Sequence, residues 1–571
     1  MSQGSNLLSE ERCRRHGWWL LLLLTALLYL PGTGTMPLMD RDEPRFANAT
    51  LEMMERGTWT VPYFNGEYRF DKPPLTYWWM RLHYWLAGQG ELGARLHSVV
   101  AAYLTALVIG GLVRRVTGAS HTGLMAGLMW LTTVQVLIHG RLCVADMPMI
   151  LCVTLAFRAL LELLVLRGGK QSFIWWSVLW LSLGLGFLAK GPIALLVPGL
   201  SLLLWRFAFW RKPVEWRNLR ALPGLVVMIL PVAAWGVPAL IETNGLFWEI
   251  GMGRHVVKRG VEVLNGRKFI PGYYLLTTWL SLFPWLFFIM PVWRMLRVRW
   301  TAELTFLAAW FVLPQLLFSF YATQLPHYVM PGYPAFIALL AVAWCNGSRQ
   351  DEVLSPVLAK WGIAFVAGLI AMIFFATWFV PIGIPDLQIF MRSSSALLLG
   401  IFVFGGIGSL YAWRARGHWR WIMPLFAVLG SATCLLPFSH SLRQTSVTIQ
   451  VSRALATMPA ETKFFGYGYD EPSLVFYTQK RWEMGAKIPV IRQQMETGGP
   501  CAAVLLRREW TLEHEIKSWM GNKARDTPAK DRSKEVDSLL AAFPNAETRV
   551  ITGFNGARSS WTEVIVLSLR R

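Results

Sequence analysis

The chain has 571 residues, of which 54% are hydrophobic and only 16% are charged, and its formal net charge is +21. This composition excludes an ordinary soluble globular protein and indicates an integral membrane protein. The Lys and Arg residues form small clusters at the ends of apolar runs instead of one stripe or tail, which argues against a nucleic-acid partner and favours membrane lipid headgroups and phosphate-bearing substrates.

Apolar runs of about 17 to 25 residues are the pattern of membrane-spanning helices, and we predict about thirteen spans. The first run lacks a small-x-small cleavage site, so we expect a retained span and not a signal peptide. The predicted spans cover residues 17–30, 94–113, 122–138, 147–166, 173–188, 194–209, 222–240, 273–292, 304–320, 331–344, 362–379, 396–413 and 421–437.

One family of turns is strongly basic, which places these turns in the cytoplasm by the positive-inside rule. The alternate turns then face outward, and they hold most of the unusual polar groups. A channel or transporter would carry ionisable groups in the middle of its spans, whereas an enzyme acting on membrane-anchored molecules would carry them at span ends on one face. The basic turns lie at residues 12–15, 114–115, 167–170, 211–220, 294–299 and 414–420.

The first outward loop, residues 36–92, is too long for a simple turn and contains the densely charged stretch 40–45. The apolar spacing of residues 46–55 predicts a short amphipathic helix in the membrane interface. Residues 77–85 form an aromatic stretch of the kind found at headgroup level. Whether these segments are only structural anchors or part of a site, they hold Asp42 and Lys72 close to the bilayer surface.

The chain changes character near residue 438, after which no further span is predicted. Residues 439–571 predict a small soluble α/β domain, and an odd number of preceding spans places it on the outer face. The polar segment 521–534 is expected to be a mobile loop. Strands are predicted near 463–467, 503–506, 549–552 and 562–569, and helices near 446–458, 512–520 and 533–542.

Motifs across the membrane half carry a family resemblance. Asp-Glu-Pro-Arg-Phe-Ala at 42–47 is followed by Gly-x-Trp-x-Val-Pro at 57–62, Asp-Lys-Pro-Pro-Leu-x-Tyr-Trp at 71–78, Ala-Asp-Met-Pro at 145–148, Lys-Gly-Pro at 190–192, Phe-x-Pro-x-Tyr-Tyr at 269–274, Phe-Pro-Trp at 283–285 and Leu-Pro-His-Tyr-Val-Met-Pro at 325–331. In this order they resemble the glycosyltransferase-C enzymes that use polyprenyl-phosphate sugars. These include the bacterial lipid A aminoarabinose transferases and are distantly related to protein O-mannosyltransferases. One departure is Gln324, where many relatives carry Lys.

The resemblance implies an α-helical polytopic membrane domain of the glycosyltransferase-C type over residues 1–438, in the bacterial inner membrane with a periplasmic active site. It implies transfer of a sugar from a polyprenyl phosphate, and the leading assignment is 4-amino-4-deoxy-L-arabinose moved from undecaprenyl phosphate to lipid A. Two alternatives stay open. One is transfer of another polyprenyl-phosphate-linked sugar to a glycan, lipid or protein, and the other is a lipid-linked sugar flippase.

Displacement at an anomeric carbon passes through an oxocarbenium-like transition state, so a carboxylate is expected near the acceptor nucleophile and cations near the departing phosphate. Asp42 matches the family's acidic position in the first loop and is our first candidate, as a base or as an orienting group. Asp146 begins a predicted span. Because the helix dipole also favours an acid there, it is either an active-site acid or a structural cap.

Several cations are candidates for binding the substrate phosphate. Lys72 follows Asp71 and precedes two prolines, which limit its reach, so it either binds phosphate or pairs with Asp71 or Asp42. Arg45 is three residues from Asp42, and this spacing favours an ion pair within the loop. For Lys190 the alternative is an ion pair with Asp146. For residues 254–259 the alternative is a solvated surface, and for His327 it is a structural role. The further substrate-binding candidates are Asp71, Lys190, Arg254, His255, Arg267, Lys268, His327 and Tyr328.

We predict that the reaction needs no metal and no other cofactor. Some glycosyltransferase-C relatives use a divalent cation to hold a pyrophosphate leaving group, and Asp40, Asp42, Asp71 and Asp146 could supply oxygen ligands. A lipid monophosphate with several Lys and Arg residues around it does not require one. The six cysteines also lack paired metal-ligand spacing.

Overall fold

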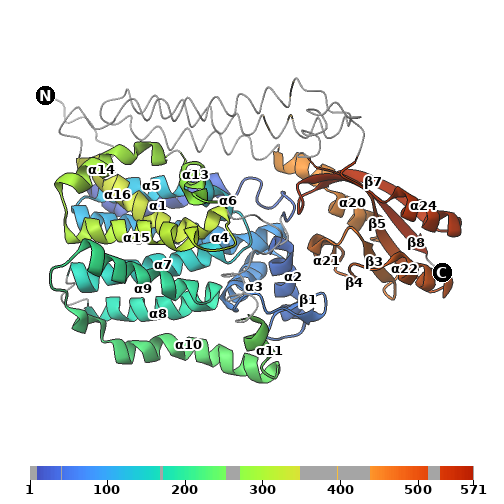
Figure 1. Ribbon diagram of the computed structural model, residues 1–571, viewed down its shortest axis with the longest axis horizontal. Helices are drawn as coiled ribbons and strands as arrows, with labels where there is room; N and C mark the ends of the chain where they lie inside the picture. Colours follow the sequence, from blue (N-terminus) through green and yellow to red (C-terminus); the bar gives the residue numbers. More distant parts are fainter. Residues whose placement is uncertain are drawn as a thin grey trace.

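The computed structural model describes residues 10–39, 42–166, 172–251, 270–283, 285–346, 438–511 and 528–569, together with residues 378, 392 and 395. The predicted spans 362–379, 396–413 and 421–437 lie outside this part of the chain, apart from the single residue 378. The helical half and a sheet domain lie side by side, with the first loop at the end of the helices that faces the sheet (Figure 1).

Within the described residues, six helices are long and apolar enough to cross a membrane, so the predicted total stays a prediction. The long helices run roughly parallel to one another (Figure 1). Their bounds are α1 (Glu10–Tyr29), α4 (Glu91–Thr117), α5 (Ser120–Leu131), α6 (Val134–His139), α7 (Asp146–Leu160), α8 (Ser172–Lys190), α9 (Ile193–Leu204), α10 (Ala221–Glu242), α13 (Tyr273–Ser281), α14 (Ile289–Val298), α15 (Ala302–Ser319) and α16 (Tyr333–Asn346).

Two segments that the sequence predicts as single spans, 122–138 and 273–292, are interrupted helices. The first breaks between α5 and α6, where the Thr132 hydroxyl donates to the carbonyl oxygen of Leu128 at 2.7 Å and accepts from Trp285 Nε1 at 3.2 Å. The second breaks between α13 and α14. The Val134 N–H donates to the carbonyl oxygen of Phe283 at 3.1 Å. Each break therefore satisfies polar groups of the other, as an apolar environment requires.

Of the basic turns, 114–115 and 211–220 lie together at one end of the helices, whereas 167–170 and 414–420 lie outside the described residues. Arg115, near the end of α4, is 3.4 Å from Glu162, and the side chain of Asn218 donates to the carbonyl oxygen of Leu163 at 3.0 Å. Trp180 Nε1 donates to the carbonyl oxygen of Leu219 at 3.0 Å. Because a helix rises about 1.5 Å per residue, the first residues of α4 and α7 lie about 20 to 40 Å away, at the other end. The predicted segregation of charge is confirmed for these turns.

The first loop folds into α2 (Asp42–Glu55), a hairpin of β1 (Tyr63–Phe64) and β2 (Glu67–Tyr68), and α3 (Leu75–Ala87). The predicted helix at 46–55 is confirmed and begins earlier. Its apolar face packs against protein, because most of α2 is buried between α3 and α21 (Pro472–Thr478) of the sheet domain, and its position at the membrane interface stays a prediction. Phe46 and Tyr77 stack at 5.2 Å between ring centroids, and Phe476 completes this core.

The sheet domain confirms the strands predicted after residue 439. The main sheet has the order β4-β3-β5-β8-β7, in which β3 is parallel to β4 and β5 while β8 is antiparallel to β5 and β7. The predicted helix 512–520 lies outside the described residues, and the predicted loop 521–534 includes β6. The elements besides α21 are α20 (Val447–Ala454), β3 (Lys463–Tyr467), β4 (Trp482–Glu483), α22 (Ile488–Glu496), β5 (Cys501–Thr511), β6 (Lys530–Asp531), α24 (Ser533–Ala542), β7 (Glu547–Asn555) and β8 (Ser560–Leu569).

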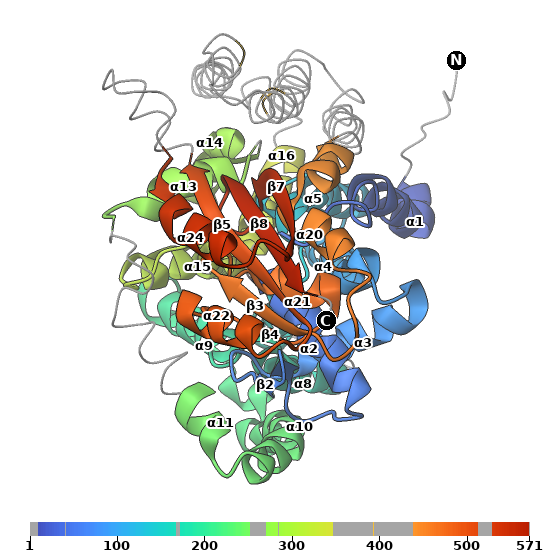
Figure 2. The same cartoon turned by 90° about the vertical axis from the view of Figure 1, so that its right-hand side faces the viewer.

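The tight turn of the first-loop hairpin contacts the sheet domain. Figure 2 shows this domain in front of α2 and β2. Asn65 and Gly66 both have positive φ, 57° and 87°, as a two-residue hairpin turn requires. The Glu52 carboxylate accepts from both backbone N–H groups, at 2.6 and 3.0 Å. On its other side, the Asn65 amide donates to the carbonyl oxygen of Trp482 at 2.7 Å and accepts from its N–H at 2.8 Å. The sheet domain thus holds the first loop directly.

Candidate active site

The first group of candidate residues gathers around the start of α2. Asp42 is the first residue of the helix, and 59% of its side chain is exposed. Arg45 Nη1 lies 4.0 Å from its carboxylate, which confirms the expected ion pair within the loop. An exposed pair at this distance is weak, so the Asp42 carboxylate can exchange its partner for a substrate group.

Asp71 lies near Asp42, since both carboxylates act electrostatically on Arg69 and Tyr77. Among the described residues, the ion-pair partner of Asp71 is Arg69 instead of Lys72. The Asp71 carboxylate binds Arg69 Nη2 at 3.0 Å, and Lys72 Nζ donates to the backbone carbonyl of Asp71 at 3.0 Å. Arg69 also donates to the Tyr77 hydroxyl at 3.0 Å. We call Asp42, Arg45, Arg69, Asp71 and Lys72 the first-loop cluster.

Electrostatics keep Arg69 charged despite its burial. Burial alone lowers the pKa of Arg69, but the contacts with Tyr77 and Asp71 outweigh it and raise this pKa above the usual value. Burial raises the pKa of Tyr77, so its phenol is neutral near pH 7. Sequence patterns do not single out Arg69. The available signal was its position two residues before Asp71, which is the spacing that places two side chains on one face of an extended segment.

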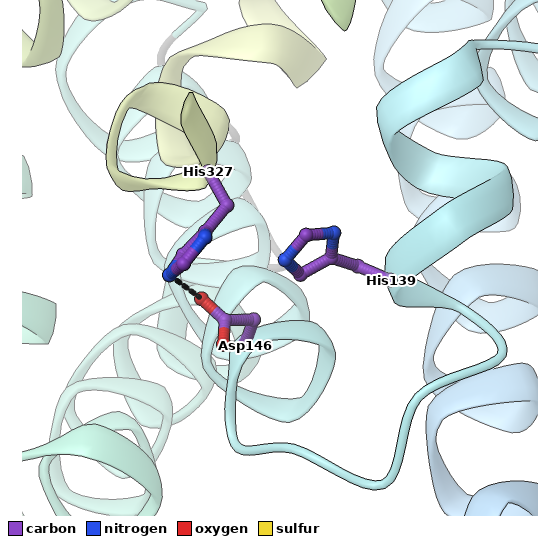
Figure 3. A group of neighbouring side chains, drawn as sticks. All are labelled: His139, Asp146 and His327. Atoms are coloured by element: carbon purple, nitrogen blue, oxygen red, sulfur yellow. Dashed lines mark ion pairs between the residues drawn. The ribbon is translucent and has the colours of Figure 1, made fainter. Parts of the chain in front are cut away.

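A second group lies where α7 begins and α8 ends. Lys190 Nζ donates to Asp146 Oδ1 in a short ion pair, and both side chains are largely buried. His327 Nε2 is 4.0 Å from the same oxygen, and the rings of His139 and His327 are 4.8 Å apart. Figure 3 shows the two imidazoles flanking the carboxylate from different segments. We call His139, Asp146, Lys190 and His327 the Asp146 cluster.

The Asp146 cluster also contains the type of atoms that bind metals. One ligand atom from each of His139, Asp146 and His327 lies within 4.8 Å of the others, and imidazole with carboxylate suits zinc or iron. The Lys190 ammonium, however, occupies the Asp146 oxygen that faces His327. A second cation there would meet that charge, so the donor set fits an ion-pair network better than a metal site.

Neighbouring contacts fix the remaining candidates. Lys190 Nζ is 5.8 Å from the ring centroid of Tyr328, which brings that predicted residue to the Asp146 cluster. The side-chain amide of Gln135 lies 3.0 Å from His139 Nδ1, and burial lowers the pKa of His139, so this ring is neutral. Gln324, at the position where many relatives carry Lys, accepts from the Ile270 N–H at 2.9 Å and has a structural contact.

The two clusters are connected through a buried ion pair that sequence patterns do not reveal. Arg95 binds the Glu43 carboxylate with its Nε and Nη2 atoms, both at 2.8 Å, and both side chains are fully buried. The Cys143 N–H donates to the same carboxylate at 2.9 Å. The only sequence signal was an arginine at the start of the apolar run 94–113. Arg254, His255, Arg267 and Lys268 lie outside the described residues.

Comparison with known proteins places this arrangement in a family. The crystal structure of ArnT from Cupriavidus metallidurans bound to undecaprenyl phosphate has the same fold, with a TM-score of 0.76 over 97% of this chain and 98% of that one at 20% identity. An undecaprenyl phosphate-alpha-4-amino-4-deoxy-L-arabinose arabinosyl transferase of Edwardsiella ictaluri is 30% identical over 74% of this chain and 75% of that protein. The chain belongs to this family.

Further matches agree with membership of this arabinosyl transferase family. A similarly named transferase of Sodalis glossinidius is 29% identical over 70% of this chain and 72% of that protein. Residues 71–235 match the family model described as dolichyl-phosphate-mannose-protein mannosyltransferase. The resemblance drawn from the motifs is thereby confirmed. The chain is a glycosyl transferase with the glycosyltransferase-C membrane fold followed by a small sheet domain.

Proposed function

We propose that this chain transfers 4-amino-4-deoxy-L-arabinose from undecaprenyl phosphate to lipid A at the periplasmic face of the bacterial inner membrane. The observation that carries the proposal is the identity to the Edwardsiella ictaluri arabinosyl transferase, which extends over three quarters of both chains. The periplasmic assignment is supported by the basic turns 114–115 and 211–220, which lie together at the opposite end of the helices from both clusters; the positive-inside rule assigns such turns to the cytoplasm.

In the proposed step, an acceptor oxygen bonds to the anomeric carbon of the sugar while the bond from that carbon to the donor phosphate oxygen breaks. The electron pair leaves with the phosphate, and undecaprenyl phosphate is the second product. Charge grows on that phosphate in the transition state, so preorganised cations lower the barrier. Lys72 and Arg45 of the first-loop cluster are exposed enough to reach it, whereas Lys190 is largely buried.

Asp42 is proposed to act at the acceptor. Its exposed carboxylate at the start of α2 can accept a proton from an acceptor hydroxyl or can orient an acceptor that is already anionic. Asp146 is proposed to position Lys190 beside Tyr328 through their ion pair. Asp42 and Asp146 therefore have different roles. The Asp71 carboxylate takes neither role in this proposal, because it is paired with Arg69.

The deciding experiment is transfer by the purified chain in liposomes. Undecaprenyl phosphate carrying aminoarabinose and lipid A are supplied, and the products are identified by mass spectrometry. We expect lipid A with an added aminoarabinose mass and free undecaprenyl phosphate. A product formed only with another lipid-linked sugar or another acceptor would replace the assigned substrates. Movement of the donor across the bilayer without any transfer would replace the enzyme by a flippase.

A further inference from the structure

Glu43 follows Asp42 directly, yet its side chain points away from solvent into a completely buried contact with Arg95. We propose that Glu43 and Arg95 are positioning residues that set the Asp42 carboxylate relative to the Asp146 cluster. The inference rests on the proposed function, because it concerns the same reaction. It assigns neither residue a contact with substrate.

The hydrogen bonding of this pair is complete. Arg95 has five N–H donors, and besides its two bonds to Glu43 it donates to the carbonyl oxygens of Thr33, Met36 and Pro37 at 2.8, 2.6 and 2.7 Å. The Glu43 carboxylate accepts from Arg95 twice, from the Met39 N–H at 2.7 Å and from the Cys143 N–H at 2.9 Å. A carboxylate can accept about four such bonds. All donors of the guanidinium and all acceptor sites of the carboxylate are used.

These bonds join segments that are far apart in the sequence. Arg95 Nη1 and Nη2 grip the chain between α1 and α2, Glu43 is the second residue of α2, and Cys143 stands three residues before Asp146. The Cys143 Sγ also lies 3.3 Å from the Glu43 carbonyl oxygen. The residue after Asp42 is therefore tied to the turn that leads into Asp146. If either segment moves, these hydrogen bonds must break or the other segment must move with it.

Contacts of Asp42 itself do little to fix its side chain, so its position depends on neighbouring residues. Its side chain has only the 4.0 Å contact with Arg45 among the ion pairs of the described residues, and it is mostly exposed. A buried ion pair contributes little net stability compared with apolar residues of the same size. A fully bonded pair at this place is better explained by the geometry it imposes. A misplacement of reacting groups by about 1 Å can cost about 100-fold in rate.

The test is the transfer rate of Glu43→Gln, which keeps the side-chain shape but removes one acceptor and the negative charge beside Arg95. We expect turnover to fall about 100-fold, while binding of undecaprenyl phosphate to the purified protein changes little. Arg95→Lys keeps the positive charge and loses the two-pronged contact. It should show an intermediate loss of turnover, again with undecaprenyl phosphate binding retained.

Glu162→Gln is the matched control, because Glu162 is a buried partner of Arg158 at 2.6 Å in the same membrane half but at the far end of the helices. It should lower thermal stability without lowering turnover of the folded protein. Normal turnover in folded Glu43→Gln or Arg95→Lys overturns the proposal. So does failure of both variants to fold while the control folds, since the pair would then hold the fold and not the site. Absence of transfer in the unmodified protein would instead reject the proposed function.

Discussion

The carboxylates of Asp42 in the first-loop cluster and of Asp146 in the Asp146 cluster lie in opposite environments. Asp42 is 59% exposed with an arginine 4.0 Å away, whereas the Asp146 side chain is 9% exposed with Lys190 in direct contact. A carboxylate in water can change partners at little cost, but a buried pair resists any change because the remaining charge would be left unpaired. We therefore assign the exchange of ion-pair partners during the reaction to Asp42 in the first-loop cluster. The Asp146 cluster supplies a buried ion pair that does not change partners.

The largest expected effect is that of Asp42→Asn. The amide keeps the size of the side chain but cannot take up a proton, and general base catalysis contributes about 10²- to 10⁴-fold. We expect transfer to fall about 1,000-fold, with the thermal unfolding midpoint and undecaprenyl phosphate binding unchanged. Turnover is measured by mass spectrometry of the glycosylated acceptor. Transfer within a few-fold of the unmodified protein would remove Asp42 from the chemistry and break the comparison.

A second prediction concerns the buried pair. Asp146→Asn leaves Lys190 charged and unpaired, and breaking such a pair costs about 3 kcal/mol of folding free energy. The double variant Asp146→Asn with Lys190→Met removes both charges and should regain much of that stability.

Thermal unfolding in detergent and transfer are measured for the single variants and the double variant. If the cluster supplies fixed charge to the site, stability returns in the double variant and transfer does not. Recovery of both stability and transfer would show that the Asp146 cluster is purely structural. The two clusters would then differ in function as well as in exposure.

A smaller effect is expected at the contact between the hairpin turn and the sheet domain. Asn65→Gly tolerates the positive φ but loses both bonds to Trp482, each contributing about 1 kcal/mol. We expect transfer to fall about 5-fold and limited proteolysis to release the sheet domain more readily. Gln494→Gly, on helix α22 of the same domain, is the control for a lost amide, because the side-chain hydrogen bonds of Gln494 among the described residues reach only residues of the sheet domain. Unchanged transfer together with faster proteolysis would show that the domain does not support the first-loop cluster.

The smallest expected effect is that of metal removal. Because Lys190 neutralises the Asp146 carboxylate, chelation with EDTA should leave turnover unchanged. Transfer is compared before and after dialysis against EDTA and after addition of Zn²⁺ or Mg²⁺. A loss that either ion restores would show that His139, Asp146 and His327 bind a cation, and would make the second cluster the more reactive one.

Local patterns predict much of this molecule. Alternating apolar residues indicate the strands of the sheet domain, and the order of the motifs along the membrane half indicates the family. The first loop is partly predictable, since the spacing of Asp42 and Arg45 is a helical one. What cannot be predicted depends on partners distant in sequence. Glu43 meets Arg95 52 residues away and Cys143 100 residues away, and no periodicity encodes such contacts.

The interrupted spans escape prediction for a related reason. Hydropathy measures the apolar character of a run but not whether its backbone stays helical, and the breaks near Thr132 and Phe283 remain apolar. They are tolerated because each supplies hydrogen bonds to the other. Arg69 is not singled out because the motif contains Lys72, whereas the Asp71 carboxylate pairs with the arginine that precedes the motif.

The hydrogen bonds between Trp482 and Asn65 have a consequence for folding during translation. The two residues are 417 positions apart, so at about 5 to 20 residues per second the hairpin turn is synthesised tens of seconds before strand β4 exists. During that interval the loop that carries Asp42 lacks the contact that β4 supplies to its hairpin. A chain that is released early, before the sheet domain has been synthesised, never gains that contact. Translation itself thereby orders assembly: insertion of the helices comes first, and the last domain made closes the hairpin turn of the first loop.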